Sequence, residues 1–360
     1  MRLRLLTLTL LSFCLTGLLP AHALENDESI WPRLVMRMQL VNNQQREIID
    51  WARRYSRHPR NVETMLARAE PYLWDIVQIC ERYRMPAEVA LLPAIESGFN
   101  PHAQSPYKAN GLWQFIPMTG RTMGLPMNAQ YDARRDTVAS TTAAMRYLRR
   151  LHGMFGDWNI ALAAYNIGEG GMQRYMAKQP GVTDFWALEL PRETFEQVRR
   201  LMAIALIVEK PHRFNVKLPR IADRPLTEKI TLTGPTNLAL AAHDARVPEQ
   251  TIRTYNPGLV TLANSSAKQV LLLPPAQAQR MRTALKQKRY PPGRAPGAIV
   301  KTAARTNARV HIIKRGDSLW TIARQHRVTV EALRRHNNLK KTAVLHPGKT
   351  LQIPPVGTRS

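Results

Sequence analysis

Apolar residues recur at helical spacing through most of the N-terminal part of this chain. Between Ile30 and Tyr83 the pattern is amphipathic, with Pro59 and Pro71 as punctuation. A further helix is predicted over 132–151, where small apolar side chains form a narrow stripe that can pack closely against a neighbouring helix. We therefore expect this part of the chain to be a mainly α-helical bundle.

One carboxylate lies on the apolar face of such a helix. If the segment opened by Pro86 is helical, then Val89, Leu92 and Glu96 share one stripe. Removing water from a carboxyl group raises its pKa, and the negative end of a helix raises it further. Glu96 is therefore a candidate general acid at neutral pH. The alternative is a helix-end glutamate that turns into solvent.

Two further motifs follow Glu96-Ser97. One is the segment 105–117, which contains Gly-Leu-Trp-Gln at 111–114, and the other is Ala-Tyr-Asn at 164–166. In order and spacing the three resemble the Glu-Ser, Gly-Leu-(Met/Trp)-Gln and Ala-Tyr-Asn motifs of family 1 lytic transglycosylases, which cleave peptidoglycan glycan strands. The resemblance extends from about residue 85 to residue 219. It implies a lysozyme-like helical catalytic domain.

The resemblance also implies a role for each motif residue. Glu96 would protonate the glycosidic oxygen and then take the proton of the C6 hydroxyl, which attacks C1 and leaves a 1,6-anhydromuramoyl end. Gln114 would bond the glycan or Glu96. Gly111 would let the backbone approach the sugar, and Trp113 would form an apolar wall, with Phe115 and Ile116 in the core. Tyr165 and Asn166 would orient the acetamido group. The predicted substrate-binding residues are Ser97, Ser105, Gly111, Trp113, Gln114, Tyr165, Asn166 and Gln197.

Position 197 departs from the family pattern. After its Glu-Thr the family usually has Tyr-Val-Pro, and that tyrosine reaches the catalytic glutamate. Here Gln197-Val198-Arg199 follows Glu193-Thr194. A glutamine amide can also donate a hydrogen bond. We therefore expect the support of the acid to be altered.

A second catalytic carboxylate is not evident. Most glycoside hydrolases need two, and Asp132, Asp136 and Glu169 are candidates only by position, since each is more simply a cap, a turn residue or a surface charge. One acid suffices for a lytic transglycosylase. A hydrolytic muramidase on the same fold is one alternative, and a non-catalytic peptidoglycan-binding scaffold is another.

The segment 310–354 resembles a LysM domain over its whole length. The pattern predicts a strand, a helix capped by Asp317, a helix capped by Thr329 and a second strand, which is a βααβ module. The predicted glycan-binding residues are Gly316, Asp317, Ser318 and Leu319.

An internal repeat precedes this module. Ile252 and Asn256 align with Leu333 and Asn337 at one constant offset, so 226–275 resembles a degenerate LysM. It has Pro235-Thr236 where the C-terminal copy has Gly-Asp. It therefore docks on the catalytic domain or binds sugar itself, and the sequence leaves both open.

The remaining segments complete the expected organisation. Residues 1–23 are typical of a cleaved secretory signal, and Phe13 before Cys14 argues against a lipoprotein. Residues 24–84 form a helical lead-in and 85–219 the transglycosylase domain. Residues 276–309 are a basic linker without acidic residues, helical at first and flexible after Pro291. The mature protein, expected in the periplasm or cell envelope, would keep Cys80 as a small core residue.

The net charge of the chain limits the classes of binding partner that we expect. The formal net charge of +26 favours an anionic partner, either nucleic acid or a cell envelope. Export weakens the case for nucleic acid, and aromatic residues do not alternate with the basic runs as single-strand binding requires. We expect peptidoglycan glycan strands as the partner, with electrostatic association with an anionic envelope surface. No metal-ligand spacing or phosphate loop is present, so neither a metal nor a cofactor is predicted.

Overall fold

The computed structural model describes residues 29–41, 45–232, 234–262, 269–291, 310–314, 316–326, 328–337, 339 and 345–354. The chain divides into two compact units, Met1–Gly293 and Arg294–Ser360. The predicted signal segment 1–23 and the stretch 292–309, predicted to be flexible, lie outside the described residues.

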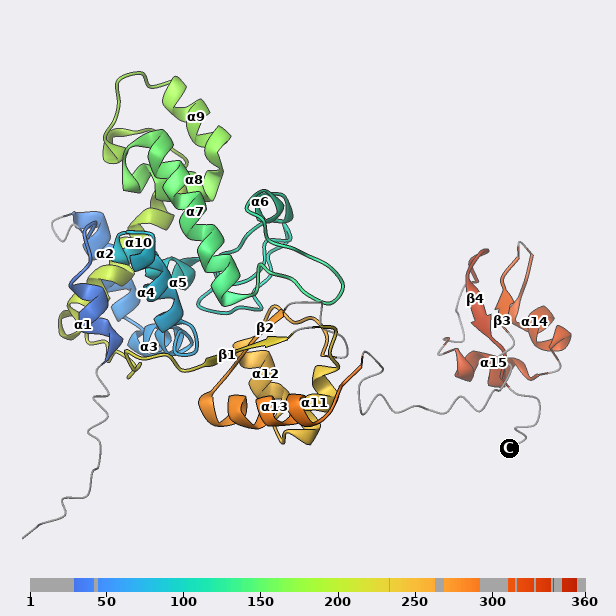
Figure 1. The fold of residues 1–360 in the computed structure, drawn as a ribbon. Helices are drawn as coiled ribbons and strands as arrows, with labels where there is room; N and C mark the ends of the chain where they lie inside the picture. Colours follow the sequence, from blue (N-terminus) through green and yellow to red (C-terminus); the bar gives the residue numbers. More distant parts are fainter. Residues whose placement is uncertain are drawn as a thin grey trace, which may run out of the picture. The chain divides into compact units, whose positions relative to one another are not determined.

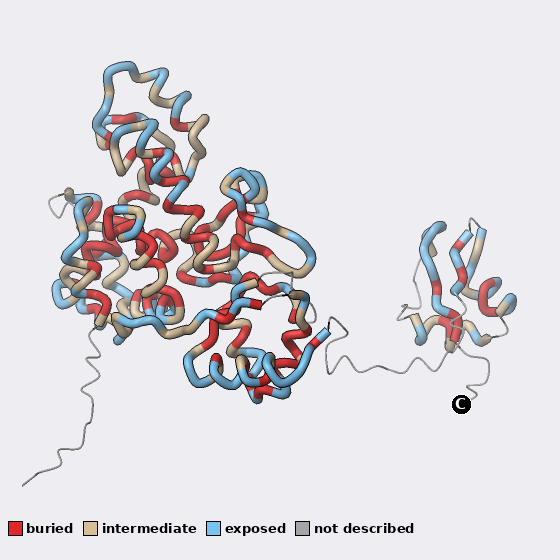
Figure 2. Tube along the Cα trace, viewed as in Figure 1, coloured by how far each residue is buried: buried red, intermediate tan, exposed pale blue. Residues whose placement is uncertain are grey.

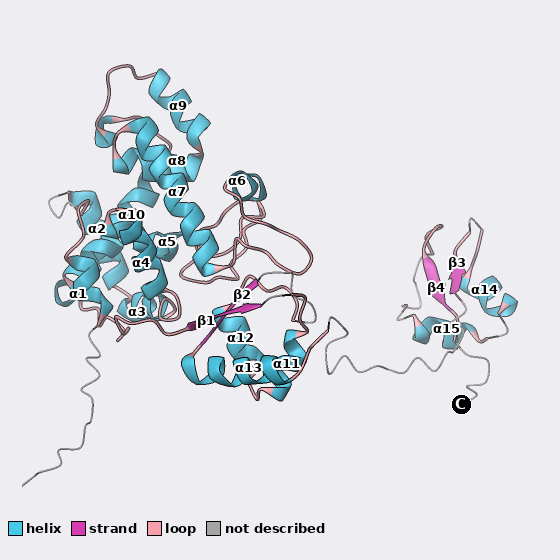
Figure 3. Ribbon diagram, in the orientation of Figure 1, coloured by secondary structure: helices cyan, strands magenta, loops and turns pink. Residues whose placement is uncertain are grey.

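The larger unit begins with a helical region (Figures 1 and 3). Its elements are α1 (Ile30–Val35), α2 (Arg46–Ser56), α3 (Pro59–Ala67), α4 (Leu73–Arg82), the 3₁₀ helix η1 (Ala87–Leu91), α5 (Leu92–Glu96), α6 (Pro117–Thr122), α7 (Thr137–Phe155), α8 (Trp158–Ile167), α9 (Glu169–Ala177), η2 (Phe185–Ala187), α10 (Arg192–Glu209) and η3 (Pro211–Phe214). The prediction of a mainly α-helical fold is confirmed.

The core of this unit surrounds α10. Every residue from Leu201 to Val208 is buried, so the second half of this helix is enclosed on all sides (Figure 2). α10 packs against α2, α8 and α5. Cys80 lies in the same core, where its Sγ is 3.5 Å from the Sδ of Met145, as expected of a small buried residue.

The helix that carries the candidate acid is interrupted. The sequence predicts one helix from Pro86, whereas the structure has a 3₁₀ turn followed by the short α5. Pro93 lacks an N–H group and cannot continue a helical hydrogen-bond ladder, which accounts for the break. Val89 and Leu92 are buried as predicted, and Glu96 is the last residue of α5.

The helix predicted over 132–151 begins later and ends later. Asp136 is its N-cap and accepts a 2.7 Å hydrogen bond from the Ala139 amide, so α7 starts at Thr137. Asp157 caps α8 through a 2.9 Å bond from the Ile160 amide. Residues 133–135 instead form a turn, from which the Arg134 side chain donates to the carbonyls of Lys108 and Phe115.

The repeat region has the predicted βααβ order. It contains β1 (Glu228–Leu232), α11 (Leu238–Asp244), α12 (Glu249–Tyr255) and β2 (Gln269–Leu273). The strands are antiparallel, with Ile230 opposite Leu271. The next helix, α13 (Pro275–Gln287), packs on β1 and α11 with Ala278, Met281 and Ala284 buried. The start of the expected linker is therefore part of this module.

The C-terminal unit is a second βααβ module. It contains β3 (Val310–Ile312), α14 (Leu319–Gln325), α15 (Val330–His336) and β4 (Thr350–Gln352), with the strands antiparallel. Ile322, Leu333 and Leu351 are in its small core. Thr329 caps α15 as predicted. The prediction that Asp317 caps the first helix is wrong, because Ser318 does so in a reciprocal capping box with Thr321.

One asparagine makes the same contacts in both modules. Asn256 donates to the carbonyls of Ile252 and Leu272 and accepts from the Leu272 amide. Asn337 does the same with Leu333 and Gln352. These three bonds tie the second helix to the second strand. They confirm the alignment of the repeat.

Candidate active site

A cleft of about 710 Å³ opens in the helical region. Five of the predicted site residues line it, namely Glu96, Ser105, Gln114, Tyr165 and Asn166. They come from α5, from the loop before α6 and from the end of α8. The predicted acid thus shares one cavity with residues of both other motifs.

Glu96 has the electrostatic properties of a neutral-pH acid. Burial raises the pKa of its carboxyl group to about 7, while a hydrogen bond from Gln197 and the charge of Arg200 act in the opposite direction. The Gln197 Nε2 donates to the Glu96 Oε1 at 2.6 Å. This glutamine therefore donates the hydrogen bond to the acid that its amide allows, and its role in place of a tyrosine stays a prediction.

Gln197 is itself held by side chains. The Asn166 Nδ2 donates to the Gln197 Oε1. The Thr194 hydroxyl in turn donates to the Asn166 Oδ1 at 3.3 Å. The hydrogen bonds therefore all run in one direction: Thr194 donates to Asn166, Asn166 donates to Gln197, and Gln197 donates to Glu96. That direction presents an N–H group to the carboxyl group.

Tyr165 lies beneath the cleft. Its hydroxyl donates to the Trp113 carbonyl at 2.7 Å. Its ring lies between those of Phe115 and Tyr147, at centroid distances of 6.1 Å and 5.6 Å. Burial and the nearby Glu96 raise the pKa of its hydroxyl well above the usual value. This tyrosine is therefore a neutral, fixed part of the wall.

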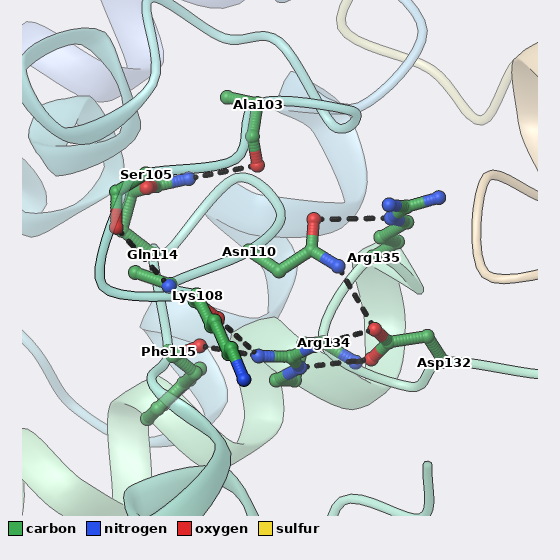
Figure 4. Close-up of polar contacts among 10 residues, drawn as sticks. Ala103, Ser105, Lys108, Asn110, Gln114, Phe115, Asp132, Arg134 and Arg135 are labelled. Atoms are coloured by element: carbon green, nitrogen blue, oxygen red, sulfur yellow. Dashed lines mark hydrogen bonds and ion pairs between the residues drawn. The ribbon is translucent and has the colours of Figure 1, made fainter. Parts of the chain in front are cut away.

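The loop before α6 is fastened by its own polar groups (Figure 4). Gln114, at a φ of 48°, donates from Nε2 to the carbonyls of Ala103 and Gly111, at 3.1 Å and 2.8 Å. The Ser105 Oγ accepts from the Ala109 amide at 3.1 Å. The amide nitrogen of Gln114 is thus used within the loop, and no described bond joins it to Glu96.

Three predicted roles need correction. A Cβ at Gly111 would lie 1.9 Å from the Arg134 carbonyl oxygen, so this glycine admits the neighbouring backbone and not the sugar. Trp113 is fully buried, and its Nε1 donates to the Thr141 hydroxyl at 2.9 Å, so it is no wall of the cleft. The Ser97 hydroxyl donates to the Leu112 carbonyl at 2.9 Å, and this residue does not line the cavity.

The apolar wall comes from other side chains. Phe115 and Ile116 line the cleft, and Ile116 is 38% exposed, although the sequence placed it in the core. Tyr107 and Met118 also line it and are 85% and 69% exposed. Sequence reasoning missed these two. Their signal was their position within or beside the 105–117 motif.

Comparison with known proteins identifies the family. A model described as the transglycosylase SLT domain matches residues 76–185, and a LysM domain model matches 311–354. The chain is 33% identical over 332 residues to the membrane-bound lytic murein transglycosylase D of Escherichia coli K12, covering 91% of this chain and 73% of that relative. The chain belongs to this family of lytic transglycosylases.

Two further similarities were found. A protein of Alteromonas sp. strain M-1 named for tributyltin chloride resistance is 38% identical over 148 residues, which cover 40% of this chain and 72% of that protein. The structure of the lytic transglycosylase Slt of Pseudomonas aeruginosa is 24% identical, covers 41% of this chain and 25% of that chain, and aligns with a TM-score of 0.32.

The other carboxylates of this transglycosylase have separate partners. Asp132 forms a 2.7 Å ion pair with Arg134, and Asp136 caps α7. Glu169 does line the cleft, where its Oε1 is 3.0 Å from the Arg150 guanidinium. Within the described ranges no three His, Cys, Asp or Glu side chains are grouped to hold a metal ion.

The transglycosylase's LysM loop is exposed. Gly316 has a φ of 92°, which suits its turn. The Asp317 Oδ2 accepts from the Lys314 amide and lies 2.8 Å from the His311 Nε2, so this aspartate fixes the loop to β3. Ser318 is exposed, and Trp320, one residue beyond the predicted set, is 60% exposed. In the part of the chain that the structure describes, no helix is long and apolar enough to cross a bilayer.

Proposed function

We propose that this lytic transglycosylase cleaves the β-1,4 bond between MurNAc and GlcNAc in peptidoglycan and leaves a 1,6-anhydroMurNAc end. The observation that carries the proposal is Glu96, a carboxyl group in the cleft whose pKa is raised to about 7. At neutral pH a large fraction of it is protonated and able to act as an acid. The sequence motifs around it support the substrate class.

In the proposed reaction, Glu96 gives its proton to the glycosidic oxygen as the bond from that oxygen to C1 breaks. The acetamido group of the same sugar stabilises the charge at C1. Glu96 then takes the proton of the C6 hydroxyl while O6 bonds to C1. One bond breaks, one forms and the proton returns to Glu96, so no water is consumed.

The neighbouring amides can stabilise the charged form of the acid. The Gln197 N–H is directed at Glu96 and stabilises the carboxylate after proton transfer. Asn166 holds Gln197 in that orientation and also lines the cleft, where we assign it to the acetamido group together with Tyr165. Gln114 and Ser105 are assigned to the glycan from the opposite loop.

Mass spectrometry of the products from purified murein sacculi tests the proposal. Muropeptides with a 1,6-anhydro terminus support it. Products heavier by one water, with reducible ends, would make the protein a muramidase, for which Glu169 is the second carboxylate in the cleft. Binding without any product would indicate a scaffold.

The C-terminal unit is assigned to glycan binding through Gly316, Asp317, Ser318 and Leu319. Support comes from the exposed loop that carries them and from the LysM match. We also propose that residues 1–23 direct export to the periplasm, and that the net charge of +26 adds electrostatic association with an anionic envelope surface. Binding to sacculi over a range of salt concentrations tests the last point, because exposed charges are screened by salt.

A further inference from the structure

The first βααβ module contacts the helical region at two places that the structure describes. One is α12, where the Thr254 carbonyl accepts from the Tyr72 hydroxyl at 3.1 Å, and the other is the turn 256–260. The Gly258 carbonyl accepts from the Asp132 amide at 2.8 Å, and the Val260 amide donates to the Gln130 carbonyl at 2.9 Å. Gly258 is also packed closely, since a Cβ there would lie 2.8 Å from the Tyr131 ring and 3.2 Å from the Asp132 carbonyl oxygen. The turn 256–260 is thus fitted against the segment 130–136.

That segment in turn holds the cleft loop (Figure 4). The Asp132 carboxylate accepts from the Asn110 Nδ2 at 2.8 Å and from the Arg134 guanidinium at 2.7 Å. Arg134 also donates to the carbonyls of Lys108 and Phe115, at 2.7 Å and 3.1 Å. The loop between those carbonyls is the one that carries Gln114 into the cleft. Arg134 is buried, so these are charge-assisted bonds shielded from water.

Two of the four positions that align with the predicted sugar site of the C-terminal copy are buried in this module, namely Asn237 and Leu238. Asn237 aligns with Ser318, and both are the N-caps of the first helix of their module. Ser318 is exposed, whereas Asn237 is fully buried and its amide donates to the Tyr290 carbonyl at 2.9 Å. The Ala239 amide, in the first turn of α11, further donates to the Leu262 carbonyl at 3.1 Å, which ties the start of this helix to the segment after α12.

We propose that the module formed by 228–290 is a brace for the catalytic cleft and not a second sugar-binding domain. Gly258 is the positioning residue of this module. Its contacts fix the segment 130–136, and that segment in turn fixes the loop 103–116, which carries cleft residues. The proposal rests on the proposed function for its kinetic test, but its structural test does not need activity.

The experiment uses the full chain with Gly258→Ala. No positive φ is recorded for this glycine, so the methyl group acts through its contacts with Tyr131 and Asp132 and not through backbone strain. Gly234→Ala is the matched control, because it makes the same exchange in the same module with nothing within 4 Å of the new Cβ. Asp132→Asn is a second variant. It weakens the bonds between the segment 130–136 and the loop 103–116 without changing the packing of the turn 256–260.

Two measurements are made on folded protein of each variant. Hydrogen–deuterium exchange should rise in peptides covering 103–116 for Gly258→Ala and Asp132→Asn, and stay at the wild-type level for Gly234→Ala. The kcat/KM on murein should fall by about tenfold to a hundredfold for the first two, as expected when cleft groups shift by a fraction of an ångström to one ångström. The affinity of these variants for insoluble sacculi, measured under conditions in which no cleavage occurs, should equal that of wild type.

The brace is wrong if Gly258→Ala keeps wild-type exchange in 103–116 and wild-type kcat/KM. Loss of sacculus binding by that variant, with unchanged exchange, would make the module a sugar binder instead. If wild type releases no murein product, the proposed function fails, whereas increased exchange in Gly258→Ala would still support the brace. If Gly258→Ala does not fold, Asp132→Asn decides by the same two measurements.

Discussion

The side-chain amide of Gln197 donates a 2.6 Å hydrogen bond to the carboxyl group of Glu96. A donor favours the charged carboxylate, so this bond lowers a pKa that burial raises. The acid is therefore balanced between two opposing effects. Because Asn166 directs the glutamine, that balance also depends on the Ala-Tyr-Asn motif.

The first prediction concerns the pH dependence of this balance. Cleavage begins with protonated Glu96, so kcat/KM of the wild type should fall as the pH rises through about 7. Gln197→Leu removes the donor and should move this fall to higher pH. Gln179→Leu is the control, because its amide bonds backbone at Tyr175 and Glu189 and does not line the cleft. Identical profiles for Gln197→Leu and wild type would contradict the role of residue 197.

The second prediction is that Glu96→Gln abolishes cleavage while binding to sacculi persists. The amide has nearly the shape of the acid but cannot transfer a proton, so the loss should be at least about 10² to 10⁴-fold. Glu169→Gln provides the comparison, since it removes the other carboxylate of the cleft and should keep activity within a few-fold. The assignment of Glu96 fails if the two variants behave in the opposite way.

The third prediction links the same acid to stability. Its pKa is raised in the folded state, so the folded protein holds a proton that the unfolded chain releases between about pH 4.5 and 7. Glu96 therefore costs stability increasingly as the pH rises through that window. The thermal midpoint of Glu96→Gln, relative to wild type, should be higher at pH 8 than at pH 4. A difference that does not change with pH would show that Glu96 has an ordinary pKa.

The fourth prediction is that removing 310–360 weakens binding to insoluble peptidoglycan but leaves cleavage of short soluble glycans. The division between the two units lies between Gly293 and Arg294, so the larger unit should fold without the smaller one. A tethered sugar-binding domain raises the effective substrate concentration at the cleft. Equal binding by the truncated and full-length proteins would remove the assigned role of Gly316 to Leu319.

The fifth prediction distinguishes a residue of the buried core, Trp113, from a residue of the cleft wall, Tyr107. Trp113→Phe should lower the free energy of unfolding by about 1 to 3 kcal/mol, since Thr141 loses its buried partner. It should leave KM unchanged. Tyr107→Ala should raise KM and leave the free energy of unfolding unchanged, because this ring is 85% exposed and lines the cleft. Thermal unfolding and steady-state kinetics of both proteins provide the check, and a raised KM for Trp113→Phe alone would overturn the correction.

Helical periodicity and short motifs were enough to predict the helical region, both βααβ modules and the position of Glu96. These features depend on local spacing. The N-cap at Thr329 was predictable for the same reason, since a cap satisfies an amide only three residues away.

The direction of individual side chains was less predictable. Trp113 and Ile116 are both apolar and three residues apart in an irregular loop, yet one is buried and the other lines the cleft. Helical or strand periodicity cannot assign inside and outside in such a loop. Gly111 was misread because its close neighbour, Arg134, is distant in sequence. The capping role given to Asp317 belongs to Ser318, the next residue, which is within the usual error at a helix end.

The paired asparagines Asn256 and Asn337 have a consequence for protein engineering. Each asparagine bonds the second helix of its module to the second strand and makes no bond to the loop before the first helix. The loop can therefore be exchanged while the scaffold stays intact. Grafting Gly-Asp-Ser-Leu into 235–238 should therefore yield a folded module. Residue 237 would still bond the Tyr290 carbonyl, so a gain of ligand affinity would also require a change in the segment after α13.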